Sequence, residues 1–171
     1  MNNLFLTGKI GVGKSTILKN ALKKIDLSVG GYVTERIFEG YYRKYIVKSL
    51  YDNKEKYTII KVDSRDNSKK SFMEAFENGV VSILDKSLKY RDVIVLDELG
   101  PAENDIDIFT SKVFEILDSK KIVFGVLKDD NCKFINDIKD RDDVIVITIT
   151  EENRDFILEE VVEILKNFRS L

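Results

Sequence analysis

The 171-residue chain contains no histidine and one cysteine, Cys132. The absence of histidine excludes histidine-bearing zinc hydrolase sites, histidine general bases and Ser-His-Asp triads. Catalysis must then use carboxylates, lysines and a metal ion held by oxygen ligands. A lone cysteine excludes an internal disulfide, and we interpret Cys132 as an ordinary thiol near the start of a helix.

Long apolar runs and a large net charge are missing as well. The longest apolar runs, such as 93–96, are far shorter than the roughly 20 residues that span a bilayer. A formal net charge of -2 gives no overall positive field to attract nucleic acid or an anionic membrane. The N-terminal residues lack the basic and long apolar regions of a signal peptide. We expect a cytoplasmic monomer whose main partner is neither a membrane nor nucleic acid.

Apolar segments alternate between strand-like and helix-like spacing, which predicts one α/β domain over residues 1–171. Fully apolar strands are typical of a parallel sheet covered by helices on both faces. Strands are predicted at 4–6, 32–34, 93–96, 122–126 and 144–147, with an antiparallel hairpin at 41–50 and 56–62. Helices are predicted at 17–25, 72–88, 106–117, 131–138 and from 150 onward. The last helix is expected to bury Phe156, and the polar stretch 63–70 to form a loop.

The segment that begins at Gly8 carries the clearest motif, because GKIGVGKS matches GxxxxGK[ST] at every fixed position. In such a loop the glycines allow a tight turn whose backbone N–H groups point at phosphate oxygens, and the next helix adds its N-terminal dipole. We predict that the nucleotide is bound by Gly8, Lys9, Ile10, Gly11, Val12, Gly13, Lys14, Ser15 and Thr16. Within this set, Lys14 is expected to reach the β- and γ-phosphates, and Ser15 to offer its hydroxyl to Mg²⁺.

A second motif follows the apolar strand 93–96. Asp97 and Glu98 stand at its carboxyl end, where ligands bind in open α/β sheets. We predict that Asp97 holds Mg²⁺ through water, opposite Ser15, and that Glu98 orients or deprotonates the attacking water. Leu99 and Gly100 complete the segment that is expected to face the nucleotide.

The same segment, Asp97 to Gly100, also fits the DxxG pattern of GTPases. A GTPase should carry an Asn-Lys-x-Asp guanine motif after the next strand, whereas this chain has Leu127-Lys128-Asp129-Asp130. The adjacent Asp-Glu pair instead favours the P-loop branch that places a catalytic glutamate beside the Walker B aspartate. We therefore prefer that branch.

Taken in order, these motifs resemble the THEP1-type nucleoside-triphosphatases, also called cancer-related nucleoside-triphosphatases in animals. The resembling segments are 5–16, 30–35, 93–101, 141–144 and 150–154. The glycine-rich loop is shared by a vast superfamily, whereas the GYVTE and DELGP segments are much more specific to this family.

The resemblance implies a three-layer P-loop fold with a RecA-like, mainly parallel sheet. It also implies Mg²⁺-dependent, base-tolerant hydrolysis of ATP, GTP and other triphosphates to diphosphate and phosphate. Two places depart from the family. Lys128 stands in the region where many members have a histidine, and residues 51–70 match poorly.

Arginines and tyrosines are further candidates. A cation for the transferring phosphoryl group is offered by Arg36, Arg43, Arg141 or Arg154, and we favour Arg141 or Arg154. The aromatic and basic stretch 41–57 could stack on a nucleobase or single-stranded RNA. We favour instead a two-faced hairpin that carries its tyrosines on one side.

Three functions remain in competition on this sequence. Hydrolysis of nucleoside triphosphates is the leading hypothesis. A small nucleotide or metabolite kinase would be expected to show an arginine-rich lid, and only isolated arginines are present. A nucleotide-gated switch that binds RNA or protein would use the tyrosine-rich stretch and turn over its nucleotide negligibly.

Overall fold

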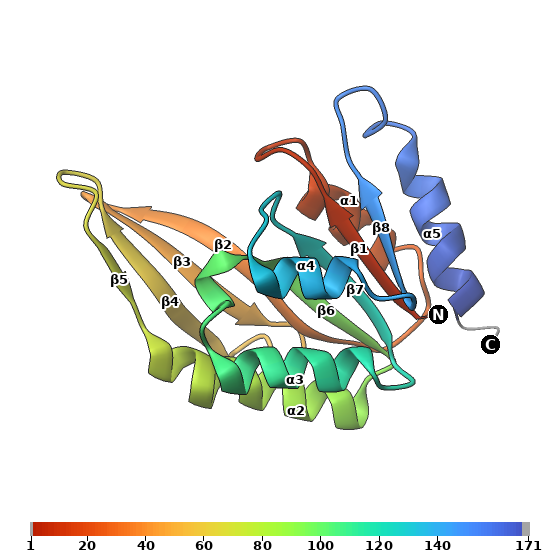
Figure 1. Cartoon of the computed structure of the whole chain (residues 1–171), viewed down its shortest axis with the longest axis horizontal. Coiled ribbons are helices and arrows are strands. Elements are labelled where there is room, and N and C mark those ends of the chain that lie inside the picture. Colours follow the sequence, from red (N-terminus) through yellow and green to blue (C-terminus); the bar gives the residue numbers. More distant parts are fainter. Residues whose placement is uncertain (1, 169–171) are drawn as a thin grey trace.

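The computed structural model describes residues 2–168, which build one eight-stranded sheet in the order β5-β4-β3-β2-β6-β7-β1-β8 (Figure 1). The strands are β1 (Asn3–Thr7), β2 (Val29–Glu39), β3 (Tyr42–Ser49), β4 (Lys56–Asp63), β5 (Lys69–Ser71), β6 (Val93–Leu99), β7 (Ile122–Leu127) and β8 (Val144–Thr148). The pairs from β2 through β6, β7 and β1 to β8 are parallel, and those from β2 through β3 and β4 to β5 are antiparallel. This is the mainly parallel sheet with an antiparallel hairpin that the sequence predicts.

Helices cover both faces of the parallel strands (Figure 1). They are α1 (Lys14–Leu22), α2 (Val81–Tyr90), α3 (Asp107–Leu117), α4 (Lys133–Lys139) and α5 (Ile157–Phe168), with a π-helical segment at Ala75–Val80 and a 3₁₀ turn at Pro101–Glu103. Along β1, Leu4 and Leu6 belong to the apolar cluster under α1 and α5, whereas Phe5 belongs to the cluster under α2, α3 and α4. Both faces are therefore buried, which is why this strand is apolar throughout. No helix within residues 2–168 is long and apolar enough to cross a membrane.

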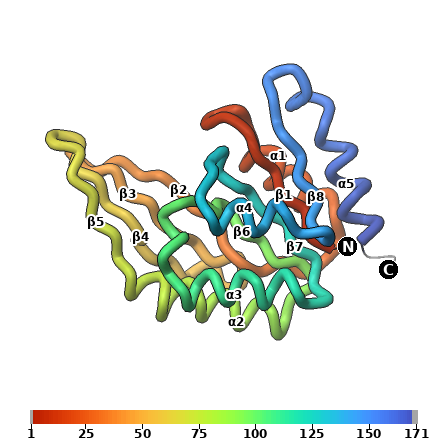
Figure 2. The backbone as a smooth tube through the Cα atoms, viewed as in Figure 1, coloured from red at the N-terminus to blue at the C-terminus, as the bar shows by residue number. Residues whose placement is uncertain are grey.

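Strand β2 is longer than predicted, and its length shapes the site. It pairs with β6 only from Val29 to Val33, the latter opposite Asp97. Beyond Val33 it continues to Glu39 paired only with β3. The antiparallel strands thus project past the carboxyl edge of the parallel sheet, as the tube in Figure 2 shows. This projection raises a wall beside the ends of β1, β6 and β7.

Several predicted bounds are wrong because local polar contacts override periodicity. The last helix begins at Ile157 rather than near Thr150, since Asn153 accepts a hydrogen bond from the Thr150 N–H and donates one to the Thr148 carbonyl, both at 2.9 Å. This turn leaves Phe156 81% exposed rather than in the core.

Two other predicted bounds lie where the chain leaves the hairpin. Helical structure begins at Met73, one residue after the predicted start, because the Phe72 N–H donates to the Ile59 carbonyl at 2.9 Å. The predicted loop 63–70 is wrong at its end, where Lys69–Ser71 forms the edge strand β5.

The predicted antiparallel hairpin is confirmed by the pairing of β3 with β4, but its tyrosines do not share one side. Tyr42 and Tyr45 are three residues apart on β3, and side chains an odd number apart point to opposite faces. Tyr45 and Tyr57 pack against the core. The Tyr42 ring lies 3.5 Å from the Lys61 ammonium. The rings therefore do not form a continuous stacking platform.

A tight approach between β2 and β6 explains the paired glycines in β2. Gly31 has φ +82°, and a Cβ there would lie 2.0 Å from the carbonyl oxygen of Val95. Its N–H donates to the Ser87 hydroxyl at 2.7 Å, which ties α2 to the strand. Only glycine fits this backbone and this spacing.

We expect Gly31→Ala to lower the free energy of unfolding by at least about 2 kcal/mol, because the new methyl group meets both steric and φ strain. Urea denaturation measures the loss. Gly40→Ala is the matched control, since Gly40 also has positive φ (+57°) but has no atom within 4 Å of the added Cβ. It should cost only about 1–2 kcal/mol. Equal losses in the two variants would contradict the close packing of β2 on β6.

Candidate functional site

The loop between β1 and α1 turns sharply at its glycines. Gly8 and Gly13 have φ of +130° and +112°, in a region that side-chain-bearing residues rarely adopt. A Cβ on Gly8 would also lie 2.3 Å from the Ile149 carbonyl oxygen. The loop is therefore packed against the segment that follows β8, and this packing requires glycine at position 8.

Lys14 opens α1 and folds back across this loop. Its ammonium donates to the carbonyls of Gly8 at 2.6 Å and Lys9 at 3.0 Å, and the residue is only 7% exposed. The cation is thus held in the centre of the glycine-rich turn, next to the first backbone N–H groups of the helix. Such a terminus with a lysine inside it is suited to phosphate oxygens.

Ser15 and Asp97 meet across the carboxyl edge of the sheet. The Ser15 hydroxyl donates to Asp97 Oδ1 at 3.1 Å, and Asp97 is 2% exposed at the end of β6. Burial raises the pKa of Asp97 to about 6, although the hydrogen bond from Ser15 opposes this shift. Within residues 2–168 no group of three or more acidic or cysteine side chains could hold a metal ion. One carboxylate and one hydroxyl fit Mg²⁺, which keeps waters and takes phosphate oxygens as its remaining ligands.

Glu98 stands next to Asp97 and faces Lys128, which follows β7. The Glu98 carboxylate is 3.5 Å from the Lys128 ammonium. The Lys128 N–H also donates to the Leu99 carbonyl at 2.9 Å, so the two segments are joined at the backbone. A Cβ on Gly100 would lie 2.7 Å from Lys128 Cδ, so glycine leaves room for the lysine stem. The sequence did not reveal this partnership, because the two residues are about 30 positions apart.

Glu103 is a second residue that sequence reasoning missed. It lies in the 3₁₀ turn after β6, is 5% exposed, and accepts a hydrogen bond from the Gly100 N–H at 2.8 Å. Burial raises the pKa of Glu103 to about 7, against the opposing charge of Lys128. The buried carboxyl group braces the loop that follows Glu98. The sequence signal that could have identified Glu103 is its position, two residues after the DELGP segment.

A cleft of about 450 Å³ brings most of the predicted residues together. Its walls include Ile10, Gly11, Gly13, Lys14, Ser15, Thr16, Asp97 and Glu98, joined by Thr34, Arg36, Tyr45 and Lys128. A second cleft of about 480 Å³ lies on the other side of the loop and is lined by Gly8, Lys9 and Val12. Arg154 also lines this second cleft. Leu99 is fully buried in the core instead of lining either cleft. Gly100 is buried next to Lys128.

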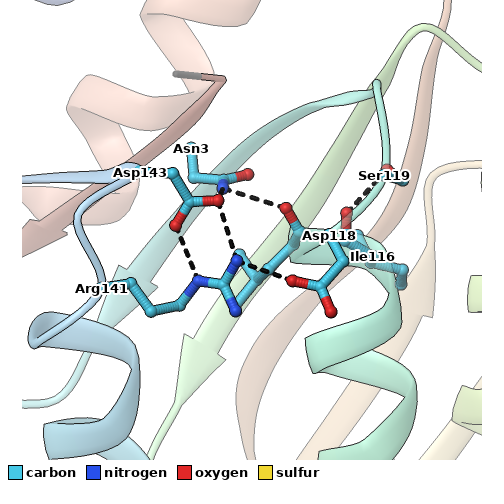
Figure 3. Close-up of polar contacts among 7 residues, drawn as sticks. Asn3, Ile116, Asp118, Ser119, Arg141 and Asp143 are labelled. Carbon is cyan, nitrogen blue, oxygen red and sulfur yellow. Dashed lines mark hydrogen bonds and ion pairs between the residues drawn. The ribbon is translucent and has the colours of Figure 1, made fainter.

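The preference for Arg141 as a phosphate-facing cation is wrong. Arg141 lies near Asn3, at the amino end of β1, whereas the glycine-rich loop follows the carboxyl end of that strand. Figure 3 shows the guanidinium between Asp118 and Asp143, with ion pairs of 2.7 Å to each carboxylate. Asn3 donates to Asp143 at 3.1 Å and completes the cluster. These contacts join the ends of α3, α4 and β1, and the role of Arg141 is structural.

We expect Arg141→Met to lower the free energy of unfolding by about 1–2 kcal/mol, because two carboxylates and a part-buried network lose their cation. Binding of ATP should be unchanged, since the cluster is at the far end of the sheet. Chemical denaturation and nucleotide titration measure the two effects. Lys133→Met is the control, because its exposed pair with Asp137 should contribute under about 0.5 kcal/mol. Loss of ATP binding at unchanged stability would contradict this assignment.

A pH-dependent stability is expected from Glu103. Its folded-state pKa is raised to about 7 from an ordinary 4.5, so the folded state binds the proton more tightly than the unfolded chain. The resulting stabilisation is complete below about pH 4.5 and is lost as the pH rises through 7. Relative to Glu103→Gln, the wild type should lose roughly 2–3 kcal/mol between pH 5 and pH 8.

Urea denaturation at each pH measures this difference. Glu160→Gln is the control, because Glu160 is exposed on α5 and its replacement should leave the wild-type pH dependence intact. Parallel stability curves for the wild type and Glu103→Gln would show that the raised pKa is absent.

Known proteins resemble this chain over almost its whole length. A family model described as NTPase matches residues 3–162. The nucleoside-triphosphatase THEP1 of Thermotoga maritima is 30% identical over 166 residues, which cover 95% of each chain. The protein of the same name from Methanocaldococcus jannaschii is 31% identical over 164 residues, covering 92% of this chain and 94% of the relative.

The fold also matches a solved structure. The crystal structure of THEP1 from the hyperthermophile Aquifex aeolicus superposes with a TM-score of 0.78 at 23% identity, and the match covers 96% of this chain and 99% of the other. The likeness confirms the three-layer P-loop architecture with a RecA-like sheet. With the family match over residues 3–162 and relatives at 30% identity, the chain belongs to the THEP1-type NTPase family.

Proposed function

We propose that this protein hydrolyses nucleoside 5'-triphosphates to the diphosphate and phosphate, with Mg²⁺ as its cofactor. The observation that carries the proposal is the convergence of Lys14, Ser15, Asp97 and Glu98 on one cleft of about 450 Å³. These residues come from two chain segments about 80 positions apart. A phosphate-binding loop, a metal-ligand pair and a carboxylate for water activation are the parts that phosphoryl transfer to water requires.

The triphosphate lies along the glycine-rich loop in this proposal. Backbone N–H groups of the loop and the Lys14 ammonium neutralise the β- and γ-phosphate oxygens. The Ser15 hydroxyl and the Asp97 carboxylate, 3.1 Å apart, would be the protein groups that hold Mg²⁺. When bound, the ion neutralises charge that develops on the transferring group and the leaving diphosphate.

Glu98 aligns the attacking water with the γ-phosphorus and accepts its proton. Lys128, 3.5 Å away, orients this carboxylate. Because Glu98 is only half-buried, water reaches it from the open side of the cleft. This geometry supports general-base assistance in line with the departing diphosphate.

Arg36 is the arginine best placed to stabilise the transition state. It lies on the projecting part of β2 and lines the same cleft as Lys14 and Glu98. Among residues 2–168 its guanidinium forms no ion pair with a carboxylate, and it lies 5.5 Å from the centre of the Phe38 ring. An unpaired guanidinium at the open side of the cleft is free to reach a γ-phosphoryl group.

We propose that the nucleoside occupies the neighbouring cleft of about 480 Å³, between the loop and the segment 148–154. This volume suits a nucleoside. Arg154 lines this cleft rather than the phosphate cleft, so its proposed role is contact with the nucleoside rather than the γ-phosphate. Since the phosphate-binding groups contact no base, ATP, GTP and other triphosphates are all expected as substrates.

The test is the release of inorganic phosphate from ATP, GTP, CTP and UTP with Mg²⁺. Lys14→Ala and Glu98→Gln should each lower kcat by about 10²–10³-fold, because each removes a group that acts on the transition state. Arg36→Met should lower kcat by roughly 10²-fold or more while ATP still binds. Omission of Mg²⁺ should abolish turnover.

Two exposed residues of α5 supply the controls. Lys166→Ala and Glu160→Gln remove the same kinds of charge from exposed residues that line neither the phosphate cleft nor the nucleoside cleft, so both should retain wild-type turnover. Binding of Mg²⁺-ATP without any phosphate release by the wild type would overturn the proposal of hydrolysis. Unchanged turnover in Glu98→Gln would remove only the role assigned to Glu98.

A further inference from the structure

A third chamber adjoins the phosphate cleft on the side of the antiparallel strands. It has a volume of about 240 Å³ and shares Thr34, Tyr45, Glu98 and Lys128 with the cleft. Strands β3 and β4 form one wall, and the 3₁₀ turn after β6 forms the other. The two spaces therefore join at Glu98, next to the expected position of the γ-phosphate.

Two cations on the wall of this chamber have no acidic partner. Among residues 2–168, neither Arg43 nor Lys69 forms an ion pair, whereas the neighbouring Lys44 pairs with Glu39. The Nε–H of Arg43 is buried and lacks a hydrogen-bond acceptor. Leaving a buried donor unsatisfied costs about 1–3 kcal/mol, so such a group points to an acceptor that a ligand supplies.

Besides Thr34, Tyr45 and the carboxyl group of Glu103, the rest of the wall is apolar. Its apolar part is lined by Ile59, Ile60, Val62, Pro101 and Ala102. An apolar surface with a few convergent polar groups is typical of a small-molecule site. The chamber is smaller than the roughly 300–1,000 Å³ of drug-sized pockets. Its occupant should therefore be a short carbon skeleton that carries an anionic group.

Glu98 borders both spaces, so the carboxylate that aligns water can equally accept a proton from a hydroxyl group in the chamber. We propose that this chamber is an acceptor subsite for a small hydroxylated phosphate ester, and that the γ-phosphoryl group can be transferred to its hydroxyl instead of to water. Arg43 and Lys69 bind the anionic end of the acceptor. The inference rests on the proposed function, because it uses the same nucleotide site and the same carboxylate.

The transfer step balances without any further reactant. The acceptor oxygen forms a bond to the γ-phosphorus while its proton passes to Glu98. The bond from the γ-phosphorus to the bridging oxygen breaks, and the nucleoside diphosphate leaves with the electron pair. Glu98 then releases the proton to solvent. Phosphoryl transfer of this kind needs positioning and charge neutralisation more than covalent chemistry by the protein.

Glycerol 3-phosphate is the probe, since it combines a phosphate ester with two free hydroxyl groups on a short three-carbon skeleton. Its binding to protein saturated with Mg²⁺-ADP is measured by calorimetry, which does not depend on turnover. With γ-labelled ATP, labelled inorganic phosphate and labelled glycerol bisphosphate are then separated and counted in one reaction. We expect saturable binding and a labelled ester product.

Neighbouring lysines on the same strands supply matched controls. Arg43→Met and Lys69→Met should each weaken probe binding at least tenfold, whereas Lys44→Met and Lys70→Met should leave it unchanged. Lys70 lies over the Phe72 ring and is not part of the chamber wall. Circular dichroism of each variant verifies folding, and the exposed Lys69 offers a test in which the fold is not at risk.

The outcomes separate this inference from the proposed function. Phosphate release without any binding of glycerol 3-phosphate overturns the subsite and leaves hydrolysis standing. Equal weakening of binding in the control variants also overturns it. Labelled ester with little labelled phosphate supports the subsite and overturns hydrolysis as the main reaction.

Discussion

Parallel pairing of β1, β7 and β6 is the constraint on which the whole site depends. Gly125 in the middle strand pairs with Phe5 on one side and Leu96 on the other. A Cβ on Gly125 would lie 2.5 Å from the Phe5 ring and 2.8 Å from the Leu96 carbonyl oxygen. Because glycine has no Cβ, the Phe5 ring can pack across the strand. Because the strands run in the same direction, their carboxyl ends share one edge. The glycine-rich loop and Asp97 meet there for that reason.

Assembling the site requires carboxyl groups to be buried, which costs folding free energy. Asp97 and Glu103 are almost fully buried, and burial raises the pKa of both carboxyl groups. Lys14 and Lys128 offset part of this cost by placing cations next to the carboxylates. Perturbed titratable groups that gather in a cleft are typical of functional sites, where stability is sacrificed for chemistry. The cluster of Arg141, by contrast, pairs every charge and lies far from the cleft.

The projecting strands extend the site beyond what the parallel sheet alone could offer. Since β2 continues past its last pair with β6, Thr34 and Arg36 stand above the carboxyl edge and close one side of the cleft. The strands paired with this extension then carry Arg43 and Lys69 to the adjoining chamber. The stretch that matches the family poorly, residues 51–70, thus supplies Ile59, Ile60, Val62 and Lys69 to the wall of this chamber.

The sequence by itself determined the glycine-rich loop, the strand before Asp97 and the alternation of strands and helices, because these features rest on neighbouring residues and on apolar periodicity. It misplaced the start of the last helix, where side-chain hydrogen bonds of Asn153 compete with periodicity. Only the tertiary structure decided which arginine faces the cleft, since that depends on how far β2 runs past β6. The contact of Lys128 with Glu98 likewise required the order of strands in the sheet. Contacts between residues distant in the chain arise from strand pairing, which periodicity cannot specify.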